Sequence, residues 1–101
     1  MLYRLALVQY GDKWQVKRIM YTKMKDSLTT GIFVRDSLGP AHNSLHQAGV
    51  YLGALHGLLA RIEFQDQIIN DPNEDSRLKS ESKAARASLV AELVKLTGVV
   101  P

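Results

Sequence analysis

The sequence contains no cysteine, and this absence excludes several kinds of site. Disulfides, thiolate zinc sites, iron–sulfur clusters and cysteine nucleophiles all require a thiol, so none of them can be built from this chain. Folding must therefore rest on the burial of apolar side chains. Because disulfides are typical of oxidising compartments, the composition favours a reducing one. We expect a cytoplasmic location.

Targeting segments and long apolar runs are also lacking. Residues 1–9 are interrupted by Arg4 and end at Gln9, which makes them too short for the apolar region of a signal peptide. The most apolar long window, residues 45–64, contains two histidines, a glutamine, an arginine and a glutamate. Such side chains are costly inside a bilayer. We expect no export signal and no contact with a membrane.

The signatures of common catalytic sites are missing as well. There is no GxSxG elbow, no GxxxxGKS/T phosphate loop and no GxGxxG fingerprint. His42 and His46 stand four residues apart, a spacing that places two imidazoles on one helix face, as zinc pairs require. No glutamate lies between them, however, and the sequence indicates no third ligand. We expect no metal, no cofactor and no catalytic residue, so a small hydrolase or metal-dependent enzyme is the least favoured alternative.

What is present suffices for a single domain of residues 1–101. Hydrophobic residues make up 46% of the chain, and three prolines with seven glycines are too few for a disordered or low-complexity sequence. The hydrophobic pattern changes along the chain from extended to helical. We predict an α+β fold in which an N-terminal antiparallel β-hairpin or three-stranded meander precedes an antiparallel α-hairpin, in the order β-β-(β)-α-α.

The β-hairpin is predicted from two apolar segments on either side of Gly11-Asp12. Gly followed by Asp suits the central positions of a type II′ turn, where glycine supplies the positive φ. This turn pairs Leu7 with Val16 and sets which side chains share a face. The face expected to meet the core comprises Tyr3, Leu5, Leu7, Trp14, Val16 and Met20. Residues 31–35, which are β-branched or aromatic in part, form a candidate third strand.

Two helices are predicted in the remaining two thirds of the chain. Residues 41–69 carry apolar side chains at alternating steps of three and four, a stripe that only Asp66 interrupts. The run from Asp71 to Glu74 forms a capping-box pattern, which predicts a second helix over residues 72–97. Gly98 is placed to end that helix. Because the connection is short, the helices should lie antiparallel.

Positive charge and aromatic side chains concentrate in residues 1–35. This segment has a net charge of +5, although the whole chain has only +3, and it holds five of the seven aromatic residues. Cations beside aromatic rings suit phosphate contacts with base stacking, or an acidic protein partner; the alternative is an ordinary solvated surface. The candidate partner-binding residues are Arg4, Tyr10, Lys13, Lys17, Arg18, Lys23 and Lys25.

Three glycines recur every fourth residue in the first predicted helix. Each costs about 0.5–1 kcal/mol of helix stability relative to alanine. Their side of the helix points about 120–140° away from the leucine stripe, so the helix has two apolar sides. A second copy of the protein could cover this side; close packing within the chain, a bend, or a ligand groove are the alternatives. The candidate self-association residues are Gly49, Gly53, Gly57, Ala60 and Phe64.

The sequence thus favours binding over catalysis. We expect a small regulatory or inhibitory interaction protein, homodimeric through its helices, that presents a basic β-surface to a protein partner or a nucleoprotein complex. Nonspecific nucleic-acid binding is the second hypothesis, since phosphate contacts need only clustered cations. No helix-turn-helix, RNP-like or GXXG signature indicates sequence-specific recognition.

Overall fold

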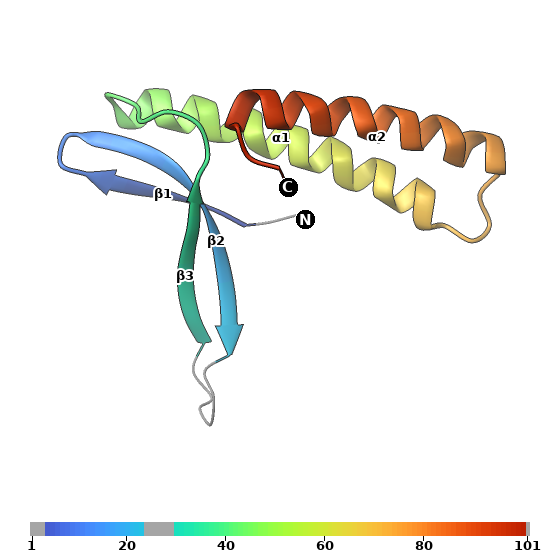
Figure 1. Ribbon diagram of the computed structural model, residues 1–101, viewed down its shortest axis with the longest axis horizontal. Helices are drawn as coiled ribbons and strands as arrows, with labels where there is room; N and C mark the ends of the chain where they lie inside the picture. Colours follow the sequence, from blue (N-terminus) through green and yellow to red (C-terminus); the bar gives the residue numbers. More distant parts are fainter. Residues whose placement is uncertain (1–3, 24–29, 101) are drawn as a thin grey trace. The chain divides into compact units, whose positions relative to one another are not determined.

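The computed structural model of the chain describes residues 4–23 and 30–100, and it has the predicted α+β order (Figure 1). The elements are β1 (Arg4–Tyr10), β2 (Lys13–Lys23), β3 (Thr30–Ser37), α1 (Leu45–Asn70) and α2 (Ser76–Thr97). Two compact units are present, one within Tyr3–Leu52 and the other within Gly53–Pro101. The assignment of residues 1–101 to a single domain stays a prediction.

The first two strands form the predicted hairpin. Tyr10 pairs with Lys13 across the turn, and Leu7 faces Val16 in the predicted register. Gly11 has a φ of 59°, the positive value that a two-residue turn requires at its first central position. On the face expected to meet the core, Val16 is fully buried. The predicted members Tyr3 and Met20 lie among the residues whose side chains fall outside this description.

β2 is the central strand of the three-stranded antiparallel sheet, whose order is β1-β2-β3. It pairs with β1 from Lys13 to Ile19 and with β3 from Lys17 to Lys23, with a register shift after Arg18 in the second pairing. The third strand is therefore confirmed, and at Thr30–Ser37 it is longer than predicted.

The chain continues beside β2 after β3 ends. The N–H of Leu38 donates to the carbonyl of Val16 at 2.8 Å. Trp14 and His42 exchange two backbone hydrogen bonds, with Trp14 N–H to His42 O at 2.8 Å and His42 N–H to Trp14 O at 2.6 Å. β2 is thus hydrogen-bonded on both sides along most of its length.

α1 begins at Leu45, four residues later than predicted. The prediction was wrong because His42 is held in extended pairing with Trp14, and because the hydroxyl of Ser44 accepts from the Gln47 N–H at 3.1 Å, as a helix N-cap does. The predicted stripe is largely buried, with Ala48, Leu55, Leu59 and Ile62 fully enclosed. Leu45 is the exception and is 54% exposed.

α2 begins at Ser76 rather than at residue 72, so the predicted capping box is wrong. The Asp71 carboxylate accepts from the Asn73 N–H at 2.9 Å and closes a turn in the connection. Asp75 is the actual N-cap and accepts from the Arg77 N–H at 3.0 Å. Gly98 ends the helix as predicted, with a φ of 73° and its N–H donating to the Val94 carbonyl at 2.7 Å.

Within the unit Gly53–Pro101, α2 runs back along the C-terminal part of α1, which confirms the predicted antiparallel hairpin (Figure 1). On α2 the side chains of Ser82, Leu93 and Thr97 are buried. The Thr97 hydroxyl donates to the Leu93 carbonyl at 2.8 Å, which satisfies a polar group in this apolar setting. Across the described residues, no helix is long and apolar enough to cross a membrane.

Candidate interaction surfaces

Four of the predicted partner-binding residues share one face of the β1–β2 hairpin. Residues on paired strands alternate between faces, and the register places Arg4, Tyr10, Lys13 and Lys17 together. We call these four residues the basic hairpin surface. Tyr10 is 53% exposed, and the Lys17 ammonium lies 5.0 Å from its ring centroid in a cation–π contact.

The lysines of this surface are held by neutral groups. Lys17 also donates from Nζ to the Ser37 hydroxyl, and Lys13 donates from Nζ to the side-chain oxygen of Asn43. Neither contact neutralises a charge, because the hydroxyl and the amide are uncharged. Both ammonium groups are therefore positioned and still available to attract an anion.

Arg18 does not belong to this surface. It is 8% exposed, and its guanidinium forms an ion pair with the Asp36 carboxylate on the neighbouring strand. The alternation along β2 places Arg18 on the face of the buried Val16, opposite to Lys13 and Lys17. Lys23 ends β2 with its side chain undescribed, and Lys25 lies outside the described residues.

The predicted glycine side of α1 is open. Gly49, Gly53 and Gly57 are exposed, and a Cβ built at any of them meets nothing within 4 Å in the part of the chain that is described. The helix continues without interruption from Leu45 to Asn70. Close packing against these glycines is therefore not found among the described residues.

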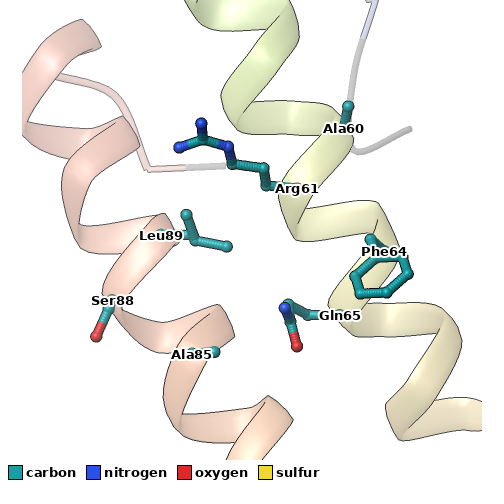
Figure 2. A pocket seen from close by; sticks show the side chains of 7 residues that line it. All are labelled: Ala60, Arg61, Phe64, Gln65, Ala85, Ser88 and Leu89. Atoms are coloured by element: carbon teal, nitrogen blue, oxygen red, sulfur yellow. The ribbon is translucent and has the colours of Figure 1, made fainter.

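A groove of about 560 Å³ lies between α1 and α2 in the unit Gly53–Pro101. Leu89 and Gln65 project from opposite helices toward one another there (Figure 2). Phe64, a predicted self-association residue, borders the groove and is 57% exposed. The full lining consists of Ala60, Arg61, Phe64, Gln65, Ala85, Ser88 and Leu89.

The α2 side of this groove was not anticipated from the sequence. Leu78, Ala85, Leu89 and Leu96 form a row along α2 at steps of seven, four and seven, beside the buried Leu93. Leu78 is 39% exposed and Leu96 37%. The signal was present in the spacing, since these four positions point to one side of the buried Ser82 and Leu93.

Comparison of the chain with protein-family models, with curated proteins and with solved structures finds no match. Function must therefore be inferred from the basic hairpin surface and the helical groove. Both are defined by residues that the structure describes, and each lies within one compact unit.

The two histidines considered as a zinc pair are not placed as one. His42 precedes α1 and His46 lies within it, so they do not occupy successive turns of one helix. The His42 ring instead contacts the Tyr51 ring, with centroids 4.9 Å apart. Among the described residues, no group of three or more histidine or acidic side chains could hold a metal ion.

Proposed function

We propose that the chain is a non-enzymatic interaction protein that self-associates through its α-hairpin and presents the basic hairpin surface to a macromolecular partner. The exposed Phe64 beside the apolar groove is the observation that carries the proposal. Burying a phenylalanine side chain away from water is stabilising. The groove beside Phe64 is large enough to receive the phenylalanine ring of another copy.

Self-association would complete the core of the α-hairpin. Two antiparallel helices form a single layer. This layer leaves Phe64 of α1 and the α2 row of Leu78, Ala85, Leu89 and Leu96 partly exposed. A second α-hairpin laid on this face gives a four-helix bundle, the usual way in which such hairpins bury their apolar sides. Twofold symmetry would insert Phe64 of each copy into the groove of the other. Burying the ring would contribute about 1–2 kcal/mol per copy.

The partner surface is the second part of the proposal. Lys13 and Lys17 keep their charge, so the surface attracts anions and speeds association with an acidic partner. Base stacking is less well supported, because Lys17 covers the Tyr10 ring and Trp14 is half-buried. An acidic protein segment is therefore favoured over single-stranded nucleic acid. The absence of cysteine accords with a cytoplasmic site of action.

Light scattering on the purified chain tests the self-association. We expect a mass of twice the monomer at tens of micromolar, and a monomer for Phe64→Glu, because a carboxylate cannot enter an apolar groove unpaired. Ala91→Glu is the matched control, since Ala91 is exposed on α2 outside the groove lining. A monomeric wild type, or equal masses for both variants, would refute the proposal.

A further inference from the structure

β1 is an edge strand of the described sheet. The sheet order places β2 on one side of β1, and no other described strand pairs with it. Trp14 and Val16 of β2 direct their backbone hydrogen bonds to His42 and Leu38, away from β1.

The outward groups of β1 follow from that pairing. Antiparallel strands alternate hydrogen-bonded and non-bonded pairs. Because Trp14 and Val16 bond on the far side, their partners Gln9 and Leu7 form non-bonded pairs and point their N–H and C=O groups outward. The same alternation places the backbone of Leu5 outward. Three residues of β1 therefore direct their N–H and C=O groups away from β2, to a side where no described strand pairs with them.

Apart from Arg4 at its start, β1 lacks the sequence features that commonly protect an edge strand. Its sequence, RLALVQY, contains no proline, lysine or glycine, and its pairing with β2 has no bulge. Natural sheets use these devices to keep other strands from adding at an edge. Leu5, Ala6, Leu7 and Val8 are only partly buried, so a docked strand would cover apolar surface as well as backbone.

The charge beside this edge selects the occupant. Arg4, Lys13 and Lys17 lie on the same face as Tyr10, whose ring already holds the Lys17 ammonium. A carboxylate of a docked strand on this face would meet the ammonium groups of Lys13 and Lys17, whose hydrogen bonds go to uncharged side chains.

We infer that the β1 edge binds an extended acidic segment of a partner protein by strand addition. The backbone of the segment pairs with Leu5, Leu7 and Gln9, and its carboxylates occupy alternate positions on the face of the basic hairpin surface. This inference rests on the proposed function and specifies the partner of that surface.

Synthetic peptides titrated against the full-length chain test this inference. The probe is a labelled seven-residue peptide in which valine and glutamate alternate, compared with a peptide of the same composition in which the glutamates are contiguous. We expect the alternating peptide to bind at least about tenfold more tightly, because only it places its charges on one face of a strand. Equal affinity for the two peptides would overturn strand addition.

Substitutions at Gln9 separate backbone pairing from charge. Gln9 is exposed and its N–H points away from β2, so Gln9→Pro removes an outward donor without breaking the sheet. Gln9→Ala is the control that keeps the N–H. We expect Gln9→Pro to weaken the alternating peptide about tenfold, within the range for a lost backbone hydrogen bond, and Gln9→Ala to have little effect. Circular dichroism confirms that both variants are folded.

Polyglutamate and a single-stranded DNA oligomer at about 50 mM salt, where phosphate contacts are strong, complete the test. Strand addition would be overturned if the chain bound polyglutamate or the DNA oligomer, if Gln9→Pro left that binding unchanged, and if the alternating peptide showed no advantage. The basic hairpin surface would then remain as an anion site. Failure of every anionic probe to bind would overturn both the inference and the proposed partner surface.

Discussion

Asp66 of α1 and Arg86 of α2 form an ion pair between the two helices, with the carboxylate oxygen 2.5 Å from the guanidinium Nε. Asp66 is the one residue that interrupts the apolar stripe of α1. Arg86 lies twenty residues further along the chain, so the local sequence around Asp66 does not indicate this partner. The ion pair compensates the charge of the Asp66 carboxylate among its apolar neighbours. Both side chains are also about one third exposed, so each charge keeps part of its solvation.

A double-mutant cycle over Asp66→Ala and Arg86→Ala measures this pair. We expect a coupling energy of about 1 kcal/mol in urea denaturation, toward the upper end for partly exposed pairs. The Arg77–Glu81 pair on α2 is the control. Its atoms are 3.4 Å apart and both side chains are mostly exposed, so its coupling should not exceed about 0.5 kcal/mol. Equal coupling in the two cycles would contradict the interhelical role.

The N-cap of α2 gives a prediction that separates Asp75 from Asp71. Asp75→Ala removes the acceptor for the first helical N–H groups and should lower the free energy of unfolding by about 1 kcal/mol. Asp71→Ala removes only a bond within the connection and should cost less. A larger loss of thermal stability for Asp71→Ala than for Asp75→Ala would contradict this assignment and support a helix that begins at residue 72.

Gly57 tests whether the open side of α1 takes part in self-association. Gly57→Ala should stabilise the monomeric Phe64→Glu background by about 0.5–1 kcal/mol, because the helix gains propensity and the new Cβ meets nothing within 4 Å among the described residues. In the wild-type background the gain should be smaller or reversed, since a second copy would occupy that space. The same gain in both backgrounds would place Gly57 outside the interface.

The burial of Tyr51 predicts how the free energy of unfolding changes with pH in the alkaline range. Desolvation by burial raises the pKa of Tyr51 above its ordinary value of 10.0. The folded state therefore holds the phenolic proton to higher pH than the unfolded chain does. The stability that this difference contributes is complete below about pH 10 and is lost as the pH rises through the pKa of Tyr51 in the folded state. Denaturation between about pH 9 and 11 should show a decline that Tyr51→Phe reduces, and an unchanged decline in that variant would contradict the assignment.

Local signals in the sequence predicted much of the fold. Gly11 with Asp12 determined the hairpin register, and Gly98 determined the end of α2, because each acts on its immediate neighbours. The starts of both helices were misplaced. α1 is delayed by a bridge between Trp14 and His42, a contact between residues 28 positions apart that no local pattern reveals.

The candidate surfaces were predicted less completely than the fold. Tyr10 and Phe64 are exposed, and the binding roles assigned to them stay predictions. Arg18 was grouped with the exposed cations, but it is buried and forms an ion pair with Asp36 of β3. The edge position of β1 was not foreseen either, because which strand lies at an edge depends on the pairing of the whole sheet.

Cross-linking through a single introduced cysteine tests self-association through the α-hairpin most directly. Because the chain has no cysteine, Ala60→Cys places one thiol at the groove, and Ala91→Cys places one on α2 outside it. With a flexible bifunctional thiol reagent at tens of micromolar protein, we predict a covalent dimer for Ala60→Cys and essentially none for Ala91→Cys. A monomer for Ala60→Cys, or equal cross-linking of both variants, would contradict the account.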